Sequence, residues 1–426
     1  MTHTKNAIVI GGGIAGCSSA YSLAKRGWQV TLIEQAQALA QGASGNPIAV
    51  LYARLTGNPS LINHLAIASF EFSHQLLSEL NLSTVDYQKC GVLQLSFNPR
   101  EIERHLKFMA GNPQKIAQYM NQTEASAIAG IPLNSGGLFM PNAGWVNPSA
   151  FCKALANHPN IHICYTSTAI TLAATNDGWQ VFSSQKLLAQ APTVIIANAN
   201  QAKQFAQTQH LPLTPVRGQL SSIPSHIITQ LNPLKTIVCG DSYLSPIVDD
   251  YQHVGTTFSP NDLETSIRDS EHIQNLSALN TITHVDVSQL NKTEILSQFK
   301  GRVASRCQTT DYLPLAGQLM NAQQLRQNPP RINANSESLP WIKGLYINVG
   351  HGAKGLITAP YCAELIAESL TSSLPKVSRD MLNVLNPNRF LLRDLGLKQL
   401  AKTALMYNHA DAKHAKIVER SLSAAS

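Results

Sequence analysis

The sequence has few charged residues and no long apolar run. Only 13% of its 426 residues are Asp, Glu, Lys or Arg, which is about half of the usual share. No run approaches the roughly 18 apolar residues that a transmembrane helix needs, so we expect no membrane association. The hydrophobic fraction of 44% excludes an intrinsically disordered chain.

Cysteine is also scarce, which bears on metal binding and on the compartment. The chain has 7 Cys, an odd number, scattered along the sequence without a CxxC pair. This pattern disfavours both a zinc site and a disulfide framework. We therefore expect no bound metal and a cytoplasmic protein.

The N-terminal segment predicts a strand–helix–strand unit. Residues 7–10 form a short apolar run rich in β-branched side chains, which is typical of a buried parallel strand. A glycine-rich turn follows, then a helical segment over 17–25 and a second strand over 28–33. Such a unit is typical of dinucleotide-binding α/β proteins.

The turn in this unit has the spacing Gly11-x-Gly13-x-x-Gly16. The first glycine permits a tight turn, the second lets the backbone approach a pyrophosphate, and the third lets the helix pack closely on the strand. Glu34 ends the second strand, where it can accept ribose hydroxyls and disfavours the 2′-phosphate of NADP. FAD and NAD both fit this pattern. The expected dinucleotide-binding residues are Gly11, Gly13, Ile14, Ala15, Gly16 and Glu34.

A second strand–loop–helix unit lies near the other end of the chain, over 345–349, 350–356 and 359–370. One N-terminal unit completed by so distant a segment resembles the D-amino-acid oxidase/glycine oxidase superfamily of flavoproteins. The resemblance implies an α/β fold, with a Rossmann-like FAD-binding domain and a second, mostly antiparallel substrate domain. It also implies that a late glycine loop lies against the isoalloxazine ring. The residues of that loop are Gly350, His351, Gly352, Ala353, Lys354, Gly355 and Leu356.

Shorter motifs give a narrower resemblance. They are Gly42-Ala43-Ser44-Gly45-Asn46, residues 141–148, Pro215-Val216-Arg217-Gly218-Gln219, residues 301–306, and Gly355-Leu356 with Ala359-Pro360. Together they resemble the FAD-dependent oxidoreductase half of the bifunctional tRNA 5-methylaminomethyl-2-thiouridine biosynthesis proteins. This resemblance implies removal of the carboxymethyl group from 5-carboxymethylaminomethyl-(2-thio)uridine at the tRNA wobble position, giving the 5-aminomethyl nucleoside and glyoxylate. It also places further residues at the flavin, namely Ala43, Ser44, Gly45, Asn46, Arg217 and Gln219.

The sequence departs from that family at three points. The methyltransferase half is expected to be absent, so the chain is either a stand-alone oxidoreductase or a separate domain, with a separate methyltransferase as a candidate partner. Ala353-Lys354 replaces the family's Ser-Arg, which keeps the charge but loses the planar guanidinium. Ala199 stands where a glycine is common.

Arg306 is the predicted ligand of the substrate carboxylate. In glycine oxidase the carboxylate-binding Arg is followed by Thr, Asp, Pro and Gly at fixed spacings, which Thr309, Asp311, Pro314 and Gly317 reproduce here. A guanidinium can bind a carboxylate through two parallel hydrogen bonds.

Other residues carry weaker expectations. Tyr243 could supply a second donor or simply pack in a strand, and Lys354 is an alternative cation for the carboxylate. His351 is expected to pack against the flavin rather than shuttle protons. The sarcosine oxidases bind FAD covalently through a Cys that aligns with Arg306, one position from Cys307, so we expect non-covalent FAD.

The expected domains are discontinuous. The FAD-binding domain is assigned to 1–80, 145–212 and 340–385, and the substrate domain to 81–144 and 213–339. Residues 386–426 form a leucine-containing basic tail that predicts amphipathic helices, either contacting tRNA phosphates or simply solvated. The alternatives to the wobble-uridine reaction are an oxidase of free glycine-like or D-amino acids and a non-catalytic tRNA-binding flavoprotein.

Overall fold

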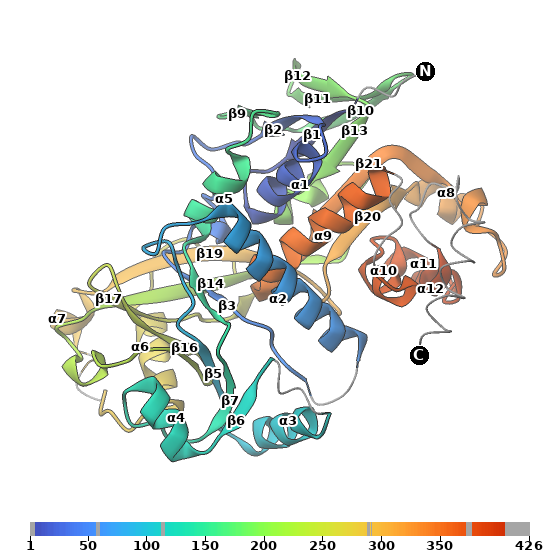
Figure 1. Cartoon of the computed structure of the whole chain (residues 1–426). Helices are drawn as coiled ribbons and strands as arrows, with labels where there is room; N and C mark the ends of the chain where they lie inside the picture. Colours follow the sequence, from blue (N-terminus) through green and yellow to red (C-terminus); the bar gives the residue numbers. More distant parts are fainter. Residues whose placement is uncertain are drawn as a thin grey trace.

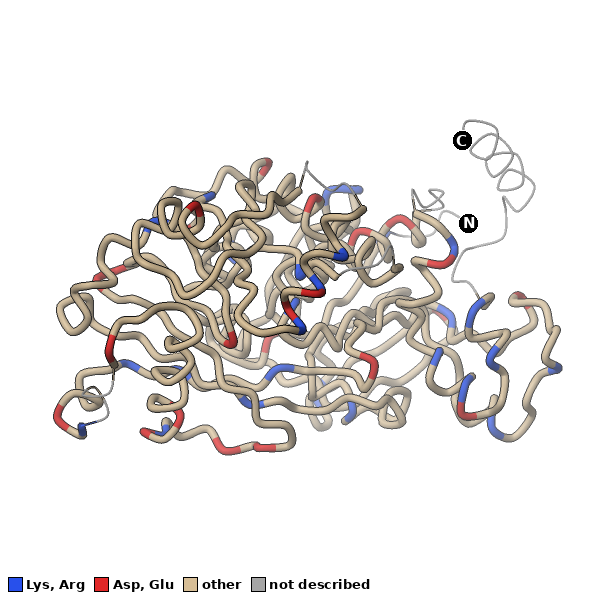
Figure 2. Tube along the Cα trace, turned by 90° about the horizontal axis from the view of Figure 1, so that it is seen from below, with Lys and Arg blue, Asp and Glu red and all other residues tan. Residues whose placement is uncertain are grey.

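The computed structural model describes residues 5–56, 60–111, 116–287, 290, 292–371 and 377–404, and Figure 1 shows two large sheets with helices around them. Lys, Arg, Asp and Glu are sparse along the described part of the trace (Figure 2). Within the described residues, no helix is long and apolar enough to cross a membrane.

The first sheet has six strands and contains both predicted strand–loop–helix units. Its order is β20 (Leu315–Met320), β21 (Trp341–Val349), β13 (Thr193–Ile196), β1 (Asn6–Ile10), β2 (Gln29–Ile33) and β9 (Ile161–Cys164). All neighbouring pairs are parallel except β20 with β21. The N-terminal and late units therefore lie in one sheet, with β13 between them.

Alternation along β1 supplies both faces of this sheet with apolar side chains. Ala7 and Val9 belong to the core beneath the helices, whereas Ile8 and Ile10 belong to the core on the opposite face. Helices α1 (Ile14–Ala24), α2 (Leu61–Leu80), α5 (Pro148–Ala156) and α9 (Gly355–Leu370) contribute many residues to the first core. The opposite face is covered by a three-stranded antiparallel sheet of β10 (Thr171–Thr175), β11 (Gly178–Ser183) and β12 (Lys186–Ala191).

The second large sheet has nine strands and is antiparallel except where β15 pairs with β5. Its path is β18 (Ser259–Pro260), β14 (Leu213–Pro224), β17 (Tyr251–Gly255), β16 (Tyr243–Val248), β15 (Ile237–Cys239), β5 (Val92–Leu95), β7 (Gly137–Met140) and β6 (Gln118–Met120), and β19 (Lys300–Thr309) pairs with β14. The helices around it are α3 (Pro99–Ala110), α4 (Gln122–Ala129), α6 (Asp269–Ala278) and α7 (Thr293–Leu296). A small sheet of β3 (Ala49–Leu51), β8 (Gly144–Val146) and β4 (Tyr87–Gln88) completes the strands.

These observations confirm the predicted α/β class with a second, mostly antiparallel sheet. The division into two domains remains a proposal. The strand composition of the first sheet favours a different boundary near residue 315. β20 lies in the six-stranded sheet, although the sequence-based assignment placed 213–339 in the substrate domain. The segment between β20 and β21 begins with helix α8 (Ala322–Gln327).

Helix α10 (Arg379–Leu385) precedes the predicted basic tail, 386–426, of which the structure describes residues 386–404. That part contains α11 (Arg389–Asp394) and α12 (Leu400–Thr403), but one of its basic residues does not lie on an exposed face. Arg389, which was counted on the basic face, is 0% exposed, and it binds the Asp311 carboxylate through Nε at 2.9 Å and Nη2 at 2.8 Å. It therefore stabilises the fold and offers no charge to a phosphate.

Candidate active site

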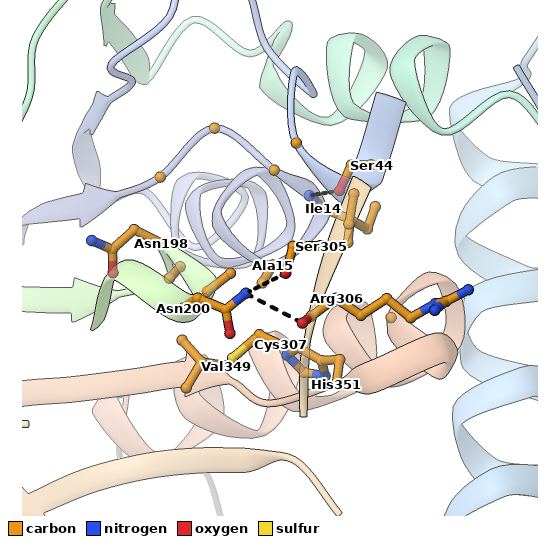
Figure 3. Close-up of a pocket in the computed structure, with 18 of the residues that line it drawn as sticks. Ile14, Ala15, Ser44, Asn198, Asn200, Ser305, Arg306, Cys307, Val349 and His351 are labelled. Carbon is orange, nitrogen blue, oxygen red and sulfur yellow. Dashed lines mark hydrogen bonds between the residues drawn. The ribbon is translucent and has the colours of Figure 1, made fainter. Parts of the chain in front are cut away.

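A cavity of about 580 Å³ opens where the carboxyl ends of β1 and β13 meet the strand β19 of the second sheet. Segments far apart in the sequence line it, namely the 10–15 turn, the 41–50 loop, residues 197–201, residues 305–307 and residues 348–356. Figure 3 shows this convergence, with Asn200 donating hydrogen bonds of 3.2 Å to Ser305 Oγ and to the Arg306 carbonyl.

The glycine turn is shaped by backbone contacts. Gly11 has φ +109°, and a Cβ there would lie 2.8 Å from the Ala197 carbonyl oxygen. A Cβ on Gly16 would lie 1.7 Å from the Gly11 carbonyl oxygen, so helix α1 approaches the turn too closely for any side chain. By contrast, a Cβ on Gly13 would have only Ser44 Oγ within 4 Å, at 3.3 Å. The backbone at Gly13 therefore faces the cavity, as a pyrophosphate site at a helix start requires.

Ser44 and Glu34 complete this end of the cavity. Ser44 Oγ accepts a hydrogen bond of 3.0 Å from the N–H of Ile14, the first residue of α1. Glu34 accepts one from Gly12 N at 2.6 Å and one from Ala36 N at 2.8 Å. Since each carboxylate oxygen can accept more than one hydrogen bond, Glu34 can still bind hydroxyl groups in the cavity that it lines.

The late glycine loop forms another wall, through the predicted residues Gly350, His351, Gly352, Ala353, Gly355 and Leu356. The His351 ring contacts Thr358 Oγ1 at 2.9 Å and Asn348 Oδ1 at 3.0 Å. Burial lowers the pKa of His351 to about 3, so the imidazole is neutral at neutral pH. Both ring nitrogens are engaged, which suits a packing role.

Arg306 lies on β19 and lines the same cavity, where its side chain extends away from Asn198 and Asn200 (Figure 3). The guanidinium donates to Thr256 Oγ1 and to the Thr257 carbonyl, the latter at 3.2 and 3.3 Å. Within the described part of the chain, no carboxylate forms a salt bridge with it. Its charge is therefore available to an anion in the cavity.

Two tyrosines lie at this cavity as well. Tyr243 was predicted, whereas Tyr52 was not, although it directly follows the segment that contains the Gly42–Asn46 motif. Burial raises the pKa of both phenols, so both remain neutral donors at neutral pH. Thr256, another lining residue, carries no sequence signal that would have found it.

Five predicted site residues do not line the cavity, namely Gly16, Gly45, Arg217, Gln219 and Lys354. Gly16 acts through the close packing described above. Gly45 leaves room for Arg302, because a Cβ there would lie 2.3 Å from Arg302 Nη2. Arg302, which was not predicted as a site residue, binds Asn46 Oδ1 at 2.8 Å and the Gly42 carbonyl at 2.6 Å and so fixes the 42–46 loop.

Arg217 and Gln219 were expected at the flavin, but their side chains bind another segment. Arg217 is 1% exposed and pairs with Glu271, and its Nε donates to the Glu264 carbonyl at 2.7 Å. The Gln219 amide bonds to the backbone of Arg268, at 2.8 Å in each direction. We therefore remove both residues from the flavin site.

One loop residue explains a departure noted in the sequence. Ala199 lines the cavity with φ +53°, a left-handed conformation that costs a non-glycine residue about 1 kcal/mol. This is the physical reason for a glycine preference at that position, and Ala199 tolerates it with a small side chain.

The cavity has the parts that FAD needs in one continuous site. Glu34 can bind a ribose, the open backbone at Gly13 can accommodate a pyrophosphate, and the loop 350–356 at the start of α9 can contact a flavin ring. Fold and site together define an FAD-dependent oxidoreductase. The chain belongs to the FAD dependent oxidoreductase family, whose profile matches residues 6–369.

The sequence is similar to those of bifunctional proteins over most of its length. The tRNA 5-methylaminomethyl-2-thiouridine biosynthesis bifunctional protein MnmC of Methylobacillus flagellatus is 45% identical over 93% of the chain, which covers 61% of that protein. The protein of the same name from Pseudomonas syringae pv. syringae is 38% identical over 92% of the chain, which covers 59% of it. The chain thus spans about three-fifths of the length of these relatives.

Solved structures support the fold. Glycine oxidase from Geobacillus kaustophilus superposes with a TM-score of 0.69 at 19% identity, covering 87% of this chain and 96% of that one. L-Proline dehydrogenase from P. horikoshii gives a TM-score of 0.70 at 17% identity, with coverages of 92% and 98%.

Proposed function

We propose that the protein removes the carboxymethyl group from 5-carboxymethylaminomethyl-(2-thio)uridine at the wobble position of tRNA. The observation that supports this most is Arg306, a cavity-lining guanidinium without a carboxylate partner among the described residues. The group to be removed is an N-substituted glycine, whose carboxylate matches this charge. The names of the relatives supply the tRNA context.

The residues of this chain would bind and orient the substrate. Bound FAD would supply the oxidising power, by accepting a hydride from the carbon beside the nitrogen, and water would then split the resulting imine of the substrate into glyoxylate and the 5-aminomethyl nucleoside. Arg306 would hold the carboxylate, and Tyr243 and Tyr52 would offer hydroxyl donors in the same cavity. A fixed carboxylate would restrict the positions that the adjacent methylene carbon can take in this cavity.

Non-covalent binding of FAD is part of the proposal. Cys307 lines the cavity and is 7% exposed. Burial raises the pKa of its thiol to about 12, so the nucleophilic thiolate is scarce at neutral pH. This supports a cofactor held by packing and hydrogen bonds alone.

Cations beside the cavity support a polyanionic substrate. Arg54 Nη2 lies 3.6 Å from Glu101 Oε1, and Arg104 binds the other oxygen of the same carboxylate. Burial, with Arg54 and Arg100 nearby, lowers the pKa of Arg104 to about 10. Burial and, after it, the charge of Arg54 lower the pKa of Lys354, whose neighbours Ala353 and Gly355 line the cavity. One carboxylate thus faces several cations, and the whole chain carries a net charge of +7.

Two further aspects belong to this proposal. We place the reaction in the cytoplasm, where tRNA is modified. The relatives are bifunctional, so the methylation that follows carboxymethyl removal would come from a methyltransferase, either fused or separate.

The test is anaerobic flavin reduction. Hypomodified tRNA that carries carboxymethylaminomethyl-uridine should bleach the flavin, whereas free glycine, sarcosine and D-alanine at millimolar concentration should not. Bleaching by the free amines but not by the tRNA would instead identify an oxidase of free amino acids, which an unpartnered Arg306 could also serve.

A further inference from the structure

The Arg217-Gly218-Gln219 segment of β14 lies directly beside Arg306. In the register of β14 with β19, Val216 is paired with Arg306 and Gly218 is paired with Ala304. Residues that alternate along a strand share a face, so Gly218 lies on the same face as Arg306, and Arg217 and Gln219 lie on the opposite one.

Gly218 provides the space for the Arg306 guanidinium. A Cβ at Gly218 would lie 2.6 Å from Arg306 Nη1 and Nη2 and 2.8 Å from Cζ. Distances under 3.0 Å force one group to move, and the group here is the end of a flexible side chain. A methyl at this position would therefore displace the guanidinium while leaving the two strands in register.

Arg217 and Gln219 hold Thr257, whose carbonyl accepts hydrogen bonds from Arg306. Arg217 pairs with Glu271, and Glu271 Oε1 accepts a hydrogen bond of 2.9 Å from Thr257 Oγ1. The backbone N–H of Gln219 donates to the same Thr257 Oγ1 at 2.9 Å. Thr257 N in turn donates to the Gln219 carbonyl at 3.2 Å.

This network is buried and ends at the cavity. Arg217 is 1%, Thr257 3% and Glu271 5% exposed. The carbonyl of Thr257 accepts both Arg306 contacts of 3.2 and 3.3 Å. A hydrogen-bonded path therefore runs from Arg217 through Glu271 and Thr257 to the guanidinium, and in a buried site each partner restricts its neighbour.

We propose that Gly218 and Thr257, with Arg217 and Glu271 behind them, are positioning residues that fix the Arg306 guanidinium for binding a carboxylate. This rests on the proposed function only in identifying that carboxylate as part of an N-substituted glycine. It gives the Arg217–Gln219 motif a role at the substrate rather than at the flavin.

The test uses glycolate, a small carboxylate, titrated into the oxidised flavoprotein and followed by the change in flavin absorbance. Gly218→Ala and Thr257→Val should each weaken glycolate binding by about tenfold, since each misplaces one charged hydrogen-bonding group. Thr257→Ser, which keeps the hydroxyl, should restore binding to near the wild-type value. Flavin content should remain normal in all three variants.

Matched substitutions elsewhere serve as controls. Thr236 is 1% exposed, and its Oγ1 has no hydrogen-bond partner within the described structure, so Thr236→Val should bind glycolate normally. A Cβ on Gly111 would meet only the Phe108 carbonyl oxygen, at 3.4 Å, so Gly111→Ala should also be neutral.

A double-mutant cycle separates positioning from a general structural role. In an Arg306→Ala background, Gly218→Ala and Thr257→Val should have no further effect on glycolate binding. Additive effects, or single variants that bind glycolate as the wild type does, would overturn the proposal. A glycolate affinity that is unchanged by Arg306→Ala alone would overturn it too.

The experiments distinguish a wrong tRNA substrate from a wrong positioning network. If the wild type binds glycolate through Arg306, Gly218 and Thr257 but hypomodified tRNA does not reduce its flavin, the positioning network stands and the tRNA substrate is wrong. If tRNA reduces the wild-type flavin while the cycle is additive, the substrate stands and the network is wrong.

Discussion

Replacing Arg306 with Ala removes the one cation that the structure places in the wall of the cavity without a carboxylate partner among the described residues. The substrate carboxylate would then be enclosed without a charged donor. Breaking a buried ion pair by removing one partner costs about 3–5 kcal/mol, which corresponds to a loss of roughly 150-fold to 5,000-fold in reduction efficiency. The free energy of folding should change less, because among the described residues the guanidinium bonds to Thr256 and the Thr257 carbonyl and lies 5.9 Å from the centroid of the Phe258 ring, without an ion pair.

The assay is anaerobic, single-turnover reduction of the flavin by carboxymethylaminomethyl-tRNA. FAD content should be normal, since Arg306 lies on β19 and not at the Gly13 turn. Affinity for tRNA should change little, because phosphate contacts dominate it. Arg306→Lys keeps the charge but loses the planar fork, so its loss should be intermediate.

Arg331→Ala, on an exposed segment outside the cavity, is the matched control and should behave as the wild type. Reduction by Arg306→Ala at near wild-type efficiency would refute the reasoning and leave Lys354 as the candidate cation. Loss of FAD from Arg306→Ala would instead make Arg306 a structural residue.

The remaining predictions concern the cofactor, the charge and the buried histidines. Acid precipitation should release intact FAD into the supernatant. Flavin that remains with the pellet would contradict non-covalent binding of FAD. Gly13→Val should yield protein without FAD, because its side chain would fill the pyrophosphate space, and a wild-type flavin content would contradict this. Reduction by tRNA should fall steeply with salt while FAD content does not, and Arg54→Gln should flatten that dependence; a salt-independent rate would favour a small substrate. Burial lowers the pKa values of His105 and His253 from 6.5 to about 4, so the unfolded state binds more protons between these values. The free energy of unfolding should therefore fall as the pH drops from about 6.5 towards 4, by about 1.4 kcal/mol per pH unit for each histidine, and an equal melting temperature at pH 7 and pH 5 would contradict this.

Local patterns predicted the FAD-binding unit well. The apolar run 7–10 and the segment 28–33 correspond to β1 and β2, and the helical segment 17–25 corresponds to α1, which begins three residues earlier at Ile14. These elements are encoded within a few residues, by β-branched runs, glycine spacing and helical periodicity. The late unit was found for the same reason, although α9 begins at Gly355, four residues before the expected helix.

The errors arose where function depends on partners distant in sequence. Arg217 and Gln219 lie in a conspicuous motif, but nothing local shows that Arg217 binds Glu271, 54 residues away. Arg389 belongs to the segment predicted as a basic tail, but it is buried against Asp311, which lies 78 residues away and is half-buried. Thr256 follows β17, which pairs with β14, and β14 pairs in turn with β19, so the sheet brings Thr256 to Arg306, 50 residues away in the sequence.

Mass spectrometry of wobble nucleosides, after incubation of the protein with hypomodified tRNA, tests the central claim most directly. The account predicts that 5-carboxymethylaminomethyl-uridine and its 2-thio form disappear, that the 5-aminomethyl nucleoside replaces them, and that glyoxylate forms in equal amount. Arg306→Ala in the same experiment should leave most of the starting nucleoside intact. Unchanged nucleosides after incubation with the flavin-loaded wild-type protein would contradict the account.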